Sequence, residues 1–250
     1  MGSQRVAKLS STREAIIQET LKEYSPRSSQ AGTQAARTAA TAVGPISRSS
    51  SFIQSLSSAS VSKSVGYLVG FANRLKVKGQ SADEALAEFG IGPDKPYPVA
   101  EFIANVREHL QEELSSQQKG TDPANAAADA IHRSVLDLLK KSVQAADVRT
   151  ATREQLTEAF RKASAREIMD TLLGHVVANL VNMVVDAASA GVDHAKVESV
   201  KKRVGEDFAQ DFVREIARLA RNGGVLPTQV PAKIPDWAKD LETFASKYRD

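Results

Sequence analysis

Polar side chains recur through the most apolar stretch of the sequence, at steps of three or four residues. They are Thr171, His175, Asn179, Asn182 and Asp186. On an α-helix this spacing places them in one narrow stripe, because side chains three and four residues apart share a face. The stripe predicts a polar pocket or a partner-facing groove. The alternative is the solvent-exposed edge of a mostly buried helix.

Catalytic chemistry has little support in the sequence. A metal site on the stripe is disfavoured because His175 and Asp186 lie about three turns apart and no second histidine follows at i+4. None of the four histidines has the neighbours in sequence that would suggest a catalytic triad, and no glycine-rich phosphate loop is present. The chain has no cysteine, which excludes thiol nucleophiles and thiolate metal sites. We therefore expect a protein that is not an enzyme and that carries no cofactor.

Positive charge is concentrated in the N-terminal third. The first 80 residues carry 11 Lys or Arg and three Glu, whereas the remaining 170 carry 22 basic and 27 acidic residues. Arg27, Arg37, Arg48 and Lys63 are candidates for phosphate contacts with nucleic acid. Because the charges are widely spaced and no aromatic residues alternate with them, such binding would be weak and salt-sensitive. A solvated tail is the alternative, and a basic cluster at residues 196–203 is interpreted as a solvated helix face.

The same N-terminal region contains a short apolar group, Phe52, Ile53 and Leu56. Between residues 25 and 64 there are 13 serines and almost no apolar periodicity, which is typical of a flexible segment. A flexible segment that folds on binding a partner would use these three side chains as apolar anchors.

Helix start signals divide the rest of the chain into helices. Capping residues are predicted at Ser11, Ser81, Asp122, Thr152 or Thr150, Ser164 and Asp193. We expect a largely flexible segment at 1–64 with a short helix near 12–24, a helical domain at 65–224, and a proline-rich linker with a C-terminal helix at 225–250. No alternating strand pattern exceeds four residues, so the predicted fold is all-α, an irregular antiparallel bundle.

Composition limits the class of protein further. Apolar residues make up 42% of the chain and aromatic residues 5%, which predicts a folded, mainly aliphatic core. The apolar stretch at 168–185 is interrupted by polar residues, which argues against a membrane span. No continuous apolar stretch marks a secretory signal at the N-terminus. We expect a cytoplasmic protein that does not bind membranes.

Several short strings follow one another in an order that is similar to a known family. They are Gly66-Tyr67-Leu68-Val69-Gly70-Phe71-Ala72, Ser81-Ala82-Asp83-Glu84-Ala85-Leu86, Ala130-Ile131-His132-Arg133, Leu136-Asp137-Leu138-Leu139 and Arg153-Glu154-Gln155-Leu156. Two long helices are expected after them. This layout resembles the B component of the Qat anti-phage defence systems, the QatB-like proteins. The Pro-Pro-Trp-like stretch and the Arg/Gly-rich motifs of that family are missing here.

The resemblance implies a non-enzymatic subunit, a scaffold, adaptor or modification substrate, of a bacterial defence complex. Its partners would be an ATPase, a queuosine-synthesis-like enzyme and a TatD-like nuclease. It further implies that the queuosine-like enzyme modifies the N-terminus at Gly2, unless Met1-Gly2-Ser3 is the remnant of an expression tag. A nucleic-acid-associated protein is the alternative function.

Overall fold

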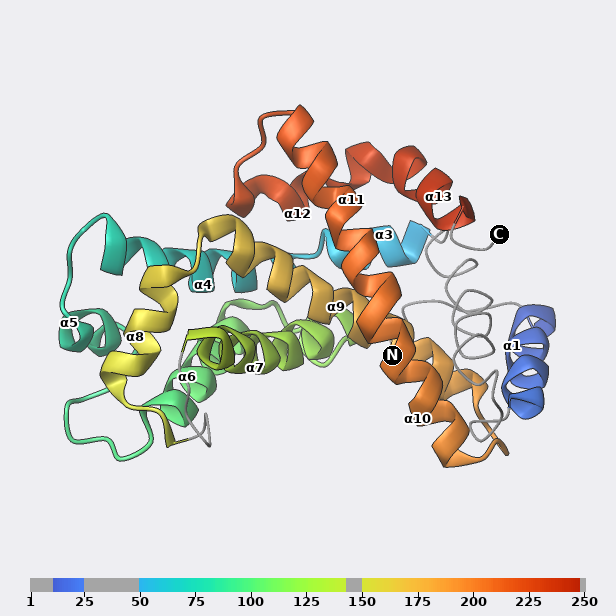
Figure 1. The fold of residues 1–250 in the computed structure, drawn as a ribbon, viewed down its shortest axis with the longest axis horizontal. Helices are drawn as coiled ribbons and strands as arrows, with labels where there is room; N and C mark the ends of the chain where they lie inside the picture. The colour runs from blue at the N-terminus through green and yellow to red at the C-terminus, as the bar shows by residue number, and fades with distance from the viewer. Residues whose placement is uncertain (1–10, 25–49, 143–149, 248–250) are drawn as a thin grey trace.

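A computed structural model of the chain describes residues 11–24, 50–142 and 150–247. Every regular element within these ranges is helical, which confirms the predicted all-α fold. Helix α9 (Ala165–Ala188) lies at the centre of the bundle and packs against α4 (Ala59–Lys76), α7 (Asp122–Ser142) and α11 (Ala209–Asn222) (Figure 1). The bundle is therefore organised around one apolar helix.

The predicted caps fix the starts of several helices. Ser81 and Thr152 form capping boxes at the starts of α5 (Ala82–Ala87) and α8 (Arg153–Lys162). In both, the cap side chain accepts a hydrogen bond from the third helical N–H, and the residue at that position bonds back to the cap.

The central helix and the next one are capped by single side chains. Ser164 accepts from the Glu167 amide at the start of α9. Asp193 accepts from the Ala195 amide at 2.8 Å at the start of α10 (His194–Arg203). Each cap satisfies a backbone donor that the helix leaves unpaired.

Helix α6 (Pro98–Glu113) begins at Pro98, and a proline suits the first helical position because it lacks a donor that would otherwise be unpaired. The second of the two long helices expected near the end of the chain follows its predicted cap, Asp193, and contains a π-helical segment. This segment, η2 (Val204–Phe208), joins α10 to α11 without a break.

The C-terminal region differs from the predicted linker. Residues 227–237 form η3 (Pro227–Gln229), α12 (Val230–Lys233) and η4 (Ile234–Trp237), followed by α13 (Ala238–Lys247). Val230 and Ile234 are fully buried, because these short helices pack onto the bundle. The prolines therefore shape a packed segment.

The prediction that residues 25–64 are flexible is wrong for residues 50–64. Helix α3 (Ser50–Leu56) and the first turns of α4 lie there, so the predicted boundary at residue 64 falls inside a helix. Phe52, Ile53 and Leu56 are buried in the core and are not free anchors for a partner. Residues 25–49 lie outside the described ranges.

Helix α1 (Ser11–Glu23) lies at one end of the molecule, against α9 and α10 (Figure 1). Ile17, Leu21 and Tyr24 are buried, and the Tyr24 hydroxyl shares a 2.5 Å hydrogen bond with Ser199. The predicted N-terminal helix is therefore part of the folded body.

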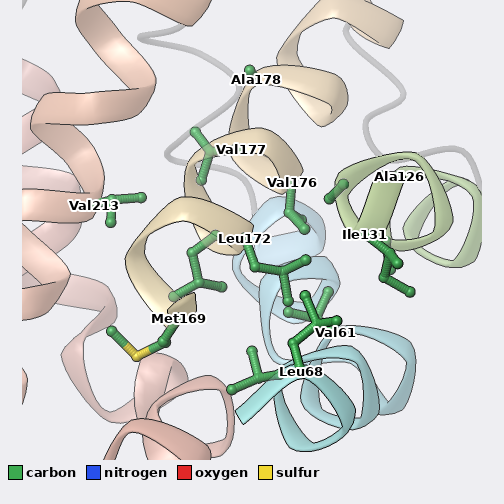
Figure 2. Close-up of a cluster of buried hydrophobic side chains, with 14 of the residues drawn as sticks. Val61, Leu68, Ala126, Ile131, Met169, Leu172, Val176, Val177, Ala178 and Val213 are labelled. Carbon is green, nitrogen blue, oxygen red and sulfur yellow. The ribbon is translucent and has the colours of Figure 1, made fainter. Parts of the chain in front are cut away.

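The core is mainly aliphatic around α9. Figure 2 shows Leu172 and Val176 of α9 on the side of Val61 and Leu68 of α4, with α7 beside them. The described core also contains two phenylalanine groups, which the low aromatic content did not predict. They are Phe71, Phe89, Phe102 and Phe160, with ring centroids 4.6 to 5.6 Å apart, and Phe52, Phe208 and Phe212.

By length and apolar composition α9 would be able to cross a membrane. Within the structure, 67% of its most apolar 18-residue window is buried. Packing against α4, α7 and α11 accounts for its apolar surface, because the central helix of a bundle is apolar on most sides.

Candidate functional site

A groove of about 980 Å³ runs along α9 between α7 and the segment formed by η2 and α11. Helix α9 is antiparallel to both neighbours. His175 of α9 hydrogen-bonds Asp137 of α7 at 2.8 Å, and the Arg166 guanidinium of α9 donates to the Ala217 carbonyl of α11 at 3.1 Å. The groove lies on the side of α9 that carries the predicted polar stripe, with α7 and α11 as its walls.

The floor of the groove is one face of α9. Its residues recur at steps of one, three and four, and they are Asp170, Thr171, Gly174, His175, Ala178 and Asn182. Along the wall formed by η2 and α11, small or medium residues recur every four positions, at Gly205, Ala209, Val213 and Ala217. Ala209, Val213 and Ala217 are already buried, because this row packs against α9.

Basic residues line both walls. They are Arg133, Lys140 and Lys141 on α7, Lys201 and Lys202 on α10, and Arg214 and Arg221 on α11. The acidic lining residues are Asp137, Asp170 and Glu198, so the lining carries seven basic groups against three acidic ones. The groove therefore attracts anions.

Some of this positive charge is balanced within the protein. Lys140 lies 3.5 Å from Asp137, and the Arg214 guanidinium lies 2.6 Å from Asp211, which is outside the groove. Lys141 lies 3.1 Å from Glu167, and Lys201 lies 2.8 Å from Glu198 and 2.9 Å from Asp186. The pairs of Lys140 and Arg214 are largely exposed, so each contributes less than about 1 kcal/mol and exchanges easily for a stronger partner. Arg133 is exposed and makes no ion pair with any residue in the described ranges.

The predicted polar stripe divides between the groove and its surroundings. Asn179 is buried and points away from the groove, since its amide donates to the Ala126 carbonyl of α7 at 3.2 Å. Asp186 lies beyond the end of the groove and pairs with Lys201 at 2.9 Å. His175 and Asn182 line the groove.

His175 is partly buried, and its Nε2 atom shares a hydrogen bond with Asp137 across the floor. This hydrogen bond holds the pKa of Asp137 below its usual range, since it stabilises the ionised carboxylate. The Asn182 side-chain oxygen is buried and has no hydrogen-bond partner among the described residues.

Asp170 is a floor residue that sequence reasoning missed as a candidate. One of its carboxylate oxygens is buried without a hydrogen-bond partner in the described part of the chain. Burial raises its pKa to about 6, and the charges of Arg166 and Arg221 oppose this rise. The Arg166 guanidinium donates to the Ala217 carbonyl. The only signal in the sequence was that Asp170 shares a helix face with Gly174.

The other candidates from the N-terminal region do not join the groove. Lys63 forms an ion pair with Glu113 of α6. Arg27, Arg37, Arg48 and Gly2 lie outside the described residues.

The side chains that line the groove are suited to binding a charged molecule by electrostatic attraction. Within residues 11–24, 50–142 and 150–247, no three His, Asp or Glu side chains gather as a metal site. A His–Asp pair also orients the base of a hydrolytic triad, but no hydroxyl of the described residues hydrogen-bonds His175. The groove therefore offers a net positive charge around a mostly polar floor, without an activated nucleophile in the described chain.

Comparison of the chain with family models, curated proteins and solved structures finds no match.

Proposed function

We propose that this protein is a non-enzymatic binding subunit that docks an acidic segment of another protein in the groove between α7, α9 and α11. The observation that carries this proposal is the lining, in which seven basic groups stand against three acidic ones. Charge of one sign across an interface steers a partner of opposite charge and selects against others.

The setting of this subunit comes from the sequence resemblance. On that basis the complex is a bacterial defence assembly in the cytoplasm, and the partner is its ATPase, its queuosine-synthesis-like enzyme or its TatD-like nuclease. The role is that of scaffold, adaptor or modification substrate. This part of the proposal rests on the strings between residues 66 and 156 and on no other observation.

Nucleic-acid binding is the second proposal, and the charge of the first 80 residues favours it. It requires phosphate contacts by Arg27, Arg37 and Arg48. Lys63 pairs with Glu113 at the surface, and a phosphate would have to displace that carboxylate. Such binding would weaken steeply between about 50 and 200 mM salt through counterion release.

The test is co-purification from source cells with a C-terminally tagged chain. Wild type is compared with a double charge reversal, Arg133→Glu with Arg214→Glu, which changes one exposed residue on each wall. The matched control is Lys78→Glu with Lys119→Glu, which removes the same charge from exposed positions outside the groove.

The proposal predicts a protein that is recovered with wild type and with the control and lost with the groove variant. Amine cross-links from that protein should map to Lys140, Lys141, Lys201 or Lys202. A partner that binds the groove variant as well as wild type would contradict docking in the groove. Nucleic acid as the sole co-purifying molecule, released at moderate salt, would favour the second proposal.

A further inference from the structure

The shape of the groove selects among acidic segments. The floor extends along α9 from Asp170 to Asn182, which at 1.5 Å per residue is about 18 Å, or roughly three helical turns. Both walls are antiparallel helices packed against α9, so the groove has the form left by a missing helix of a bundle. An extended chain would cover this length with about five residues and would not fill the groove between the walls.

Short side chains line the junction between the floor and the adjacent wall. They are Gly174 and Ala178 of α9 and Gly205, Ala209 and Ala217 of η2 and α11. Ala178, Ala209 and Ala217 are already buried, because α9 packs closely against α11 there. A bound helix would therefore gain little apolar burial at these residues, and its attraction to the groove comes mainly from charge.

The charges determine where the acidic residues of the occupant must lie. Cations stand on the α7 wall, at Arg133, Lys140 and Lys141, and on the opposite wall, at Arg214 and Arg221. The floor between them carries the Asp170 carboxylate, which repels an acid placed directly above it. An occupant therefore needs acidic residues on both flanks and neutral residues on the stripe that faces the floor.

Single-stranded nucleic acid fits the same groove less well. Among the described lining residues there is no Phe, Tyr or Trp on which a base would stack, and the imidazole of His175 is held by Asp137.

We propose that the groove receives an acidic amphipathic helix of a partner protein, about three turns long, as the missing helix of the bundle. This inference rests on the proposed function, because it names the kind of segment that the groove docks. Helix-in-groove recognition reads apolar anchors at i, i+3, i+4 and i+7 from one face of the bound helix.

The experiment is a selection of displayed random 16-residue peptides on the full chain, with counter-selection on the Arg133→Glu, Arg214→Glu variant. Selected peptides are synthesised, and their Kd values are measured by fluorescence anisotropy. Circular dichroism verifies that the variant is folded. If it is not, Lys140→Glu with Arg221→Glu provides a second charge reversal on the same two walls.

We expect peptides with small apolar residues at three- and four-residue spacing and with Glu or Asp on both flanks. Their Kd should rise at least tenfold in the groove variant and change less than twofold in the Lys78→Glu, Lys119→Glu control. Selected peptides that lack acids, or that bind the groove variant equally well, would overturn the inference. So would a 20-nucleotide single-stranded DNA that binds through the groove and loses tenfold affinity in the groove variant.

The two proposals fail separately. If a partner from source cells depends on the groove but its cross-linked segment is neither acidic nor helical, this inference is wrong and the proposed function stands. If no protein depends on the groove in cells, the proposed function is wrong, whatever peptides the selection yields.

Discussion

Asp170 provides a test of the electrostatics of the groove that needs no partner. Its carboxyl is partly buried, one oxygen has no hydrogen-bond partner among the described residues, and its pKa is raised to about 6 from an ordinary 3.8. A raised pKa means that the folded protein binds the proton more tightly than the unfolded chain does. Stability is therefore lost as the pH rises from about 4 to about 6.

The magnitude follows from the shift. About two pKa units at 1.36 kcal/mol each set a ceiling near 3 kcal/mol. Because the side chain keeps some contact with solvent, screening reduces this, and we expect about 1–2 kcal/mol. The Asp170→Asn variant has no carboxyl to ionise at this position. Its free energy of unfolding relative to wild type should therefore rise by about 1–2 kcal/mol between pH 4 and pH 7.5.

The assay is urea denaturation of both proteins at pH 4, 6 and 7.5 and at constant ionic strength, with linear extrapolation to water. Thr171→Val is the matched control, because it changes the neighbouring floor residue without removing a carboxyl. Its difference from wild type should be the same at all three pH values. If the difference between Asp170→Asn and wild type stays constant within about 0.3 kcal/mol, the argument about burial of Asp170 is refuted.

Three further predictions concern stability and are measured by the same denaturation method at pH 7.5. Phe52→Ala should cost about 3–4 kcal/mol because the ring is fully buried, whereas a loss below about 1 kcal/mol would mean that α3 is not part of the core. Arg153→Met should cost about 2–3 kcal/mol, since this buried guanidinium donates to Asp83 at 2.9 Å and to the Gly92 carbonyl at 2.6 Å; an unchanged midpoint would contradict this role. Lys63→Met should change stability by less than about 1 kcal/mol because its ion pair with Glu113 is exposed, and a larger loss would show that this ion pair contributes more to stability than an exposed pair does.

The parts of the fold that the sequence predicted rest on local signals. Ser81, Thr152, Ser164 and Asp193 cap helices by contacts within the first turn, so the residues that make the cap are adjacent in sequence. The helical spacing of apolar residues then continues along each helix to its end. These signals do not depend on the rest of the chain, and the helices begin where they predicted.

Helix α3 could not be predicted in this way. Its sequence is short and serine-rich, and its apolar side chains resemble those of a flexible segment. It is held in place by contacts that are distant in sequence, such as the edge-on packing of Phe52 against Phe212 with ring centroids 5.8 Å apart. Tertiary burial outweighs weak local propensity here.

The candidate site was predicted only in part for the same reason. The spacing of His175, Asn179 and Asn182 predicted the helix that forms the floor of the groove. Which of them face the groove depends on where α7 and α11 pack, and Asn179 turns toward α7. The small residues at every fourth position from Gly205 to Ala217 were a signal in the sequence for the face of η2 and α11 that packs against α9.

The basic residues of the helical body also affect the choice between functions. Lys201 and Lys202 belong to the cluster predicted to be a solvated helix face, Lys202 is exposed, and both line the groove. Part of the positive charge relevant to binding therefore lies in the helical body, although the body as a whole is acidic. Local arrangement, and not net charge, determines where an anionic partner would bind.

Docking of a protein in the groove is tested most directly by site-specific photo-cross-linking at Gln210, an exposed lining residue on α11. A photoreactive amino acid replaces Gln210 in the tagged chain in source cells, and the same replacement at Lys119 is the control. The account predicts an adduct at position 210 that proteases remove and nucleases do not, and that is lost when Arg133→Glu and Arg214→Glu are added. An adduct that nucleases remove, or no more adduct at position 210 than at position 119, would contradict it.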